Sequence, residues 1–166
     1  RNLRPMLRWA AEEQMIDGNP WATLRVGEKS QSRDRTLTTD EWSAIWNAAG
    51  DMPYPFGPFV QALMLSAQRL SNVAEMRWDE IHGDVWVIPR DKMKATKKES
   101  AAAHEVPLSE ALADLISKQP RRGEYVFTTS GSKAISPVSK SKAKLQKASK
   151  TIGWRFHVIR STGATL

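Results

Sequence analysis

The sequence contains no cysteine, which excludes a disulfide framework and thiolate metal sites. It has only three histidines, His82, His104 and His157, and none of them is paired at the i,i+4 spacing of zinc-binding helices. No apolar run approaches the ~20 residues that a membrane span needs, and no signal-peptide pattern opens the chain. We therefore expect a soluble, cytoplasmic protein that uses no metal or other cofactor.

Acidic residues are missing from the last quarter of the chain. After Glu124, residues 125–166 carry six lysines and two arginines, whereas the first 124 residues hold 17 basic and 18 acidic groups. The formal net charge of +7 therefore comes entirely from the C-terminal part. Such a one-sided charge is typical of a surface that binds a polyanion, although a solvated lysine-rich surface gives the same composition.

The chain is long enough for about one domain and a fragment of another, with 166 residues, 40% of them hydrophobic, and seven tryptophans. Apolar residues near helical spacing predict an amphipathic helix over residues 2–16, and Asp17-Gly18-Asn19-Pro20 is a strong turn signal after it. Residues 27–36 are polar and indicate a linker. We therefore expect the first helix to belong to a preceding domain.

The rest of the sequence predicts a mainly helical domain with a small antiparallel β-sheet, an α+β class. Thr38 and Glu41 form a capping-box pattern before a helix that Gly50 ends. Residues 53–58 are expected to form a rigid loop, and the nearly wholly apolar residues 59–67 a buried helix. Strands are expected over residues 85–88 and 104–108, and a short helix capped by Ser71 over residues 71–77. Three further helices are expected over residues 109–117, 137–150 and from 156 onward.

Four residues have the chemistry needed to cleave a phosphodiester without a metal: Arg69, Lys94, His157 and Arg160. The reaction builds negative charge on the non-bridging oxygens, which fixed donors must stabilise. Two arginines can hold both oxygens through their planar guanidinium groups. A lysine can protonate the departing oxygen, and a histidine can move a proton near neutral pH. Taken singly, each has a simpler interpretation, such as a salt-bridged arginine or a solvated loop lysine.

Three boxes in this order resemble the tyrosine recombinases, the phage-integrase family. Gln68-Arg69-Leu70-Ser71, followed by Met76-Arg77-Trp78-Asp79-Glu80-Ile81, resembles the first catalytic-arginine box. Trp86-Val87-Ile88-Pro89 leading to Met93-Lys94, then His104-Glu105-Val106-Pro107-Leu108, is similar to the hairpin that bears the catalytic lysine. Trp154 to Thr162 resembles the His-x-x-Arg box. Lys94 matches the lysine best by context, with Lys92, Lys97 and Lys98 as neighbouring alternatives.

The resemblance implies the catalytic domain of a site-specific recombinase. Such an enzyme integrates or excises a phage or mobile element by breaking and rejoining DNA through a 3′-phosphotyrosine, in the bacterial cytoplasm and at the nucleoid when bound to DNA. Arg69 and Arg160 would stabilise the phosphorane, Lys94 would act as general acid and His157 would assist proton transfer. Residues 1–26 would end a core-binding domain, 27–36 would link it, and 37–166 would form an incomplete catalytic domain.

The sequence departs from the family pattern at several places. Asn72 stands where the family often has an acidic residue, and Val158-Ile159 where many members have Asp-Leu. The sequence ends at Leu166, before the place of the nucleophilic tyrosine, and Tyr54 and Tyr125 match neither its position nor its context. Family members act as tetramers on two duplexes. We expect this piece alone to be monomeric and unable to form the covalent intermediate.

Three lysines, Lys140, Lys144 and Lys147, share one face of the predicted helix over 137–150 and are candidate contacts to DNA phosphates. Like charges at this spacing repel one another unless an anion lies opposite. A solvated face remains the alternative for these lysines. For the whole chain, the alternatives are a non-catalytic DNA-binding protein of the same fold, a type IB topoisomerase-like enzyme, and an unrelated basic helical scaffold.

Overall fold

The computed structural model describes residues 3–18, 35–92, 103–136 and 139–165, and the chain divides into two compact units, Arg1–Arg33 and Asp34–Leu166. In the first unit, α1 spans Leu3–Glu12. It ends earlier than predicted, and Gln14 has a left-handed backbone conformation (φ 56°). No helix in the described part of the chain is long and apolar enough to cross a membrane.

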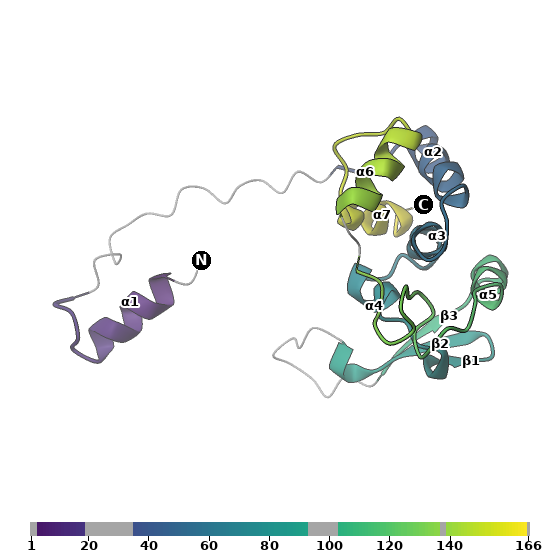
Figure 1. Ribbon diagram of the computed structural model, residues 1–166. Coiled ribbons are helices and arrows are strands. Elements are labelled where there is room, and N and C mark those ends of the chain that lie inside the picture. Colours follow the sequence, from purple (N-terminus) through teal and green to yellow (C-terminus); the bar gives the residue numbers. More distant parts are fainter. Residues whose placement is uncertain (1–2, 19–34, 93–102, 137–138, 166) are drawn as a thin grey trace. The chain divides into compact units, whose positions relative to one another are not determined.

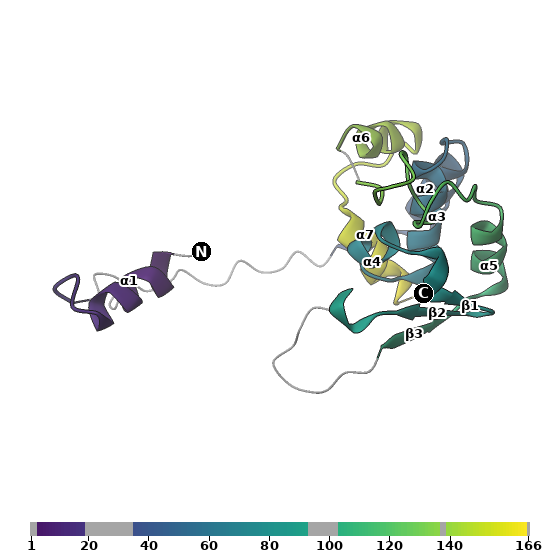
Figure 2. The same cartoon turned by 60° about the horizontal axis from the view of Figure 1, so that its bottom comes forward.

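The second unit is built around α3 (Phe56–Ser66), which lies between the β-sheet at one end and α6 (Ser139–Ala148) at the other (Figures 1 and 2). Seven of its 11 residues are buried. A helix that is apolar on all sides needs neighbours on all sides. Those neighbours are α2 (Thr39–Gly50), α4 (Leu70–Ala74), α5 (Glu110–Ser117) and α7 (Phe156–Gly163).

The helix starts follow local capping chemistry, with two corrections. The predicted capping box of α2 is confirmed, because the Thr38 hydroxyl accepts from the Glu41 N–H at 3.2 Å and the Glu41 carboxylate accepts from the Thr38 N–H at 3.1 Å. The prediction of a loop over residues 53–58 was wrong in its second half, since α3 begins at Phe56. Pro58 is tolerated there because the first-turn amides have no partner within the helix. Arg69, not Ser71, is the N-cap residue of α4.

Three antiparallel strands form the sheet in the order β1 (Ile81–His82), β2 (Val85–Ile88) and β3 (His104–Pro107). Trp86 pairs with Val106 across β2 and β3, and both are buried. A short 3-10 turn precedes the sheet (Trp78–Glu80) and another follows β2 (Arg90–Lys92). The predicted fold class, mainly α with a small antiparallel sheet, is confirmed.

Aromatic rings fill the core beside α3. Phe59 is fully buried, and its ring makes edge contacts with Phe127 (centroids 5.9 Å apart) and with Phe156 (6.3 Å). Phe156 in turn contacts Trp154, with 5.8 Å between the centroids. This cluster connects the central helix to the first residue of α7, the helix that carries His157 and Arg160.

We expect Phe59→Ala to lower the free energy of unfolding of the second unit by about 3–5 kcal/mol, because it removes buried aromatic surface and leaves a cavity among three rings. Urea unfolding followed by tryptophan fluorescence measures this. Ile152→Ala serves as the control, since that side chain is 78% exposed, and we expect it to change stability by no more than about 0.5 kcal/mol. Equal effects of the two substitutions would contradict the packing described above.

Candidate functional site

Arg69 lies at the corner between α3 and α4. Ala67 ends α3 in a left-handed conformation (φ 49°), with its N–H bonded to the Leu63 carbonyl at 3.2 Å. Arg69 follows as the extended N-cap residue of α4 and is half-buried. A left-handed backbone costs a non-glycine residue about 1–2 kcal/mol. The contacts around this corner must therefore hold it in place.

One of those contacts comes from Arg160 on α7. Its Nε donates a hydrogen bond to the Ala67 carbonyl at 3.2 Å. Gly163 permits the close approach of α7, because a Cβ at that position would lie 3.2 Å from the Trp42 ring and 3.4 Å from the Ala67 Cβ. The fold thus brings Arg160 to the chain corner that carries Arg69.

α7 also presents an exposed histidine next to this corner. His157 lies three residues before Arg160, so the two side chains share one side of the helix. No carboxylate of the described residues lies within ion-pair distance of Arg160, and its guanidinium keeps donors for an anion. His157 is the second residue of α7 and therefore lies near the positive end of the helix dipole, where Arg155 as N-cap residue supplies no capping hydrogen bond.

The fourth predicted catalytic residue, Lys94, lies outside the described residues, as do Lys97 and Lys98. Lys92, the remaining alternative, has a structural role. Its Nζ pairs with the buried Glu80 carboxylate and donates to the Glu75 carbonyl at 2.7 Å. Glu80 also accepts from the Trp86 indole N–H at 3.1 Å. A lysine engaged in this way is a poor general acid.

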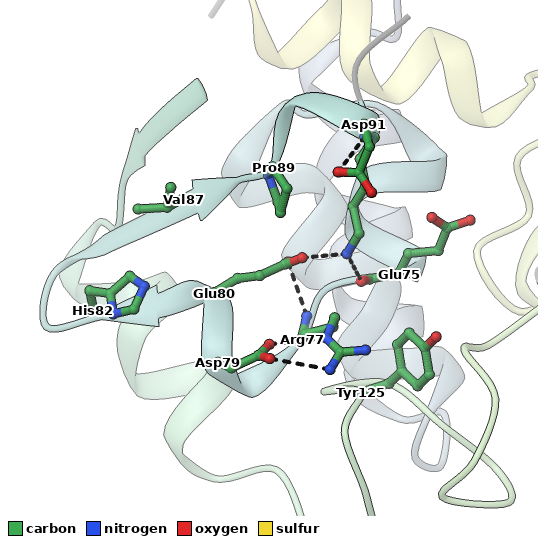
Figure 3. Close-up of a pocket in the computed structure, with 10 residues that line it drawn as sticks. Glu75, Arg77, Asp79, Glu80, His82, Val87, Pro89, Asp91 and Tyr125 are labelled. Carbon is green, nitrogen blue, oxygen red and sulfur yellow. Dashed lines mark hydrogen bonds and ion pairs between the residues drawn. The ribbon is translucent and has the colours of Figure 1, made fainter. Parts of the chain in front are cut away.

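A cavity of about 440 Å³ opens beside this pair (Figure 3). None of Arg69, His157 and Arg160 lines it. Its one arginine is already paired: Arg77 bonds Asp79 at 3.0 Å and Glu124 at 2.9 Å. The hydrogen bond from Arg77 holds the pKa of Asp79 below its ordinary value. We assign this cavity a structural role.

The three predicted DNA-contact lysines, Lys140, Lys144 and Lys147, are exposed on α6. The helix packs against α2, and its buried residue is Leu145. Lys142 differs from the other lysines, because it is half-buried with its Nζ 5.1 Å from the centre of the Trp154 ring. Burial lowers the pKa of Lys142, and the positive charge of Arg155 lowers it further. Positive charge is therefore crowded where α6 meets the start of α7.

Asn72 is a polar group enclosed beside the predicted site. It follows Arg69 by three residues in α4 and is 1% exposed. Neither its amide nitrogen nor its amide oxygen has a hydrogen-bond partner among the described residues. An unpaired buried polar group is uncommon and costs about 1–3 kcal/mol. The departure from the family pattern noted in the sequence is thus an inward-facing, neutral side chain.

The two tyrosines have structural partners. The Tyr54 hydroxyl donates to the Val126 carbonyl at 3.1 Å and accepts from the Thr128 N–H at 3.1 Å. The backbone of Tyr125 forms a bridge with Arg77, whose guanidinium carbon lies 5.7 Å from the centre of the tyrosine ring. Both tyrosines belong to the packing around the sheet.

Sequence reasoning missed the role of Arg35. Its Nη1 donates to the Ile152 carbonyl at 2.6 Å, and its second nitrogen pairs with Glu41. Two residues later, the Leu37 N–H donates to the Thr162 hydroxyl at 2.9 Å. These bonds hold the start of the second unit against α7. The sequence carried no signal of them, because the partners are more than 100 residues apart and residue 35 was assigned to a linker.

Residues 35–166 match the model of the phage integrase family. The matched residues make up most of the chain and include all three predicted boxes. The chain belongs to the phage integrase family. The integrase of Enterobacteria phage 434 is 25% identical over 173 residues, which cover 99% of this chain and 48% of that protein. The integrase of Escherichia phage HK022 is also 25% identical, over 97% of this chain and 47% of that protein. This integrase-family chain therefore spans about half the length of the curated relatives it matches.

Solved structures agree with this assignment. A lambda integrase tetramer bound to a Holliday junction superposes with a TM-score of 0.75 at 25% identity, covering 99% of this chain and 51% of that one. A DNA-bound lambda integrase gives a TM-score of 0.70 at 25% identity, covering 98% of this chain and 60% of that one. The resemblance to the catalytic domain of the tyrosine recombinases, which the sequence indicated, is confirmed for this chain.

We expect Lys92→Met to destabilise the integrase-family unit by about 3 kcal/mol, because it leaves the buried Glu80 carboxylate without its cation. Lys118→Met is the matched control, since Lys118 pairs with Asp114 where both side chains are more than half exposed. That change should cost less than about 1 kcal/mol. Thermal unfolding of the two variants measures the difference, and equal melting temperatures would contradict a structural role for Lys92.

Proposed function

We propose that this chain is most of the catalytic domain of a tyrosine-type site-specific recombinase. The reaction would break and rejoin DNA through a 3′-phosphotyrosine, to integrate or excise a phage or mobile element. The observation that supports this most directly is the hydrogen bond from Arg160 to the Ala67 carbonyl, which joins the two arginine boxes at one corner. We propose that the guanidinium groups of Arg160 and of Arg69, two residues after Ala67, together hold the two non-bridging oxygens of a phosphate.

The proposed roles follow from the chemistry of each side chain. Arg69 and Arg160 would stabilise the charge that develops on the phosphorane. His157, exposed beside the positive end of α7, would assist proton transfer near neutral pH. Lys94 would protonate the leaving sugar oxygen. The attacking group would be a tyrosine other than Tyr54 and Tyr125, whose contacts are structural.

Duplex DNA is the proposed partner, and α6 with the start of α7 is the proposed surface. The lysines on α6 are exposed, none of the three predicted DNA-contact lysines forms an ion pair among the described residues, and no acidic residue follows Glu124 in the sequence. We further propose that residues 1–26 end a core-binding domain, 27–36 link it and 37–166 form the catalytic domain. The whole protein would assemble as a tetramer on two duplexes in the bacterial cytoplasm, while this piece alone would be monomeric.

A non-catalytic DNA-binding protein of the same fold is the second candidate, and Asn72 favours it. A neutral side chain three residues after Arg69 cannot form the ion pair with an arginine that a carboxylate could form. Both candidates bind DNA, so only a cleavage assay separates them.

The test of catalysis uses a form of the protein that contains the proposed nucleophilic tyrosine. We expect Arg69→Ala and Arg160→Ala each to lower the cleavage rate of a nicked suicide duplex about 10²–10³-fold, because each removes fixed positive charge from the transition state. Arg77→Ala is the matched control, since that guanidinium is bound to Asp79 and Glu124. Unchanged cleavage by the Arg69 and Arg160 variants would refute the proposed sites. Efficient relaxation of a plasmid without any partner site would favour a topoisomerase.

The test of the DNA surface uses this chain as it is. We expect Lys144→Ala to weaken binding to a 30-base-pair duplex and to reduce the slope of log K against log [KCl] by about 0.9, because one phosphate contact is lost. The triple change at Lys140, Lys144 and Lys147 should reduce the slope by about 2.7. Lys118→Ala on α5 removes an equally exposed lysine at another part of the unit and should leave the slope unchanged. Identical slopes for all these variants would show that the lysines of α6 are solvated and do not contact DNA phosphates.

A further inference from the structure

Ile152 is the one large hydrophobic side chain left exposed among the described residues of the second unit, at 78%. It lies in the segment that joins α6 to α7, residues 149–155, which we call the α6–α7 turn. Single apolar residues on a surface are common and need no explanation by themselves. Ile152 differs from such residues because hydrogen bonds hold the turn in which it lies.

Hydrogen bonds fix the inner side of the α6–α7 turn. The Thr151 N–H donates to the Gln146 carbonyl at 3.1 Å, and Lys150 has a left-handed backbone (φ 54°). The Thr151 hydroxyl lies 2.7 Å from the Ser149 hydroxyl and accepts from the Trp154 indole N–H at 2.8 Å. Ser149, Thr151 and Trp154 are all buried. The turn is therefore bonded into the core on both sides of Ile152.

Arg35 holds the backbone of Ile152 itself. It donates to the Ile152 carbonyl at 2.6 Å, and a Cβ at Gly153 would lie 2.9 Å from the same Arg35 nitrogen. Gly153 also has a positive φ of 75°, which favours glycine. These contacts hold the backbone at Ile152, whose side chain is exposed. The structure presents it outward at a fixed position.

The exposed charges in and beside the turn are positive, and the carboxylate of Glu41, which Arg35 brings close to the turn, is already paired with that arginine. Lys150 and Arg155 are exposed within the turn, Lys147 is exposed in the last turn of α6, and residues 125–166 contain no acid. An apolar protein partner would have to desolvate these cations, which is unfavourable. A DNA duplex offers both complements, because its phosphates attract the cations and its groove walls expose apolar sugar and thymine methyl groups.

We propose that the α6–α7 turn is a DNA contact, in which Lys150 and Arg155 bind phosphates and the Ile152 side chain packs against an apolar wall of the groove. This inference rests on the proposed function, in that DNA is the partner, and it names a contact that the family boxes do not include. The turn leads directly into α7, so a contact there would also fix the duplex next to His157 and Arg160.

The experiment measures binding of this chain to a fluorescent pool of 30-base-pair duplexes with randomised sequence, over a series of KCl concentrations. We expect Ile152→Ala to weaken binding roughly fivefold at every salt concentration with an unchanged slope, because an apolar contact releases no counterion. Lys150→Ala should instead reduce the slope by about 0.9. Ile152→Leu, which keeps the apolar surface, should bind within about twofold of the unchanged protein.

The outcomes separate this inference from the proposed function. If Lys144→Ala weakens binding while Ile152→Ala and Lys150→Ala bind like the unchanged chain, the α6–α7 turn is not a contact although the DNA surface on α6 stands. If the unchanged chain does not bind the duplexes at all, both proposals fail. Thermal unfolding of each variant checks that the fold is intact, as we expect because the substituted side chains are exposed and lie outside the core. Lys118→Ala is the control in this measurement too.

Discussion

Burial of α3 on all sides is the constraint on which the rest of this structure depends. Because nearly every residue of that helix is apolar, helices from distant parts of the sequence must cover it, and α7 is one of them. The helix then ends at Ala67 in a left-handed turn, which frees a carbonyl at the surface of the core. Arg160 binds that carbonyl, and Arg69 follows it by two residues. The packing of α7 against α3 therefore brings Arg160 to the corner of the backbone that carries Arg69.

Charge is arranged differently at the two ends of the second unit. Around the sheet, cations are paired: Lys92 with the buried Glu80, and Arg77 with Asp79 and Glu124. At the α6 end, the lysines are exposed and no acid follows Glu124 in the sequence. Paired charges fix local structure and leave little attraction for a ligand, whereas crowded like charges are relieved when an anion arrives. Among the described residues, the unpaired positive charge is therefore concentrated at the α6 end.

Asn72 and Arg35 lie outside the set of predicted catalytic residues but belong to the structure around it. Asn72 is buried three residues after Arg69 and leaves both of its amide atoms without partners among the described residues. Arg35 lies far from Arg160 in the sequence, yet it bonds the turn before α7, and the Leu37 N–H bonds α7 itself. The bonds of Arg35 and Leu37 hold α7 in place without involving a predicted catalytic residue. Their contribution depends on geometry that residue type alone does not express.

Local patterns in the sequence determined the class of fold, the capping of α2, the pairing of β2 with β3, and the family. Capping, strand alternation and short boxes depend on residues close together in the chain. They did not determine where α3 begins, which residue caps α4, or which lysine near Lys94 is structural, since each of these is decided by packing and by buried partners such as Glu80. The corner that joins Arg69 to Arg160 and the bonds of Arg35 were likewise decided by tertiary structure alone. Contacts across 93 and 117 residues leave no periodic trace, because only the closure of the core brings their partners together.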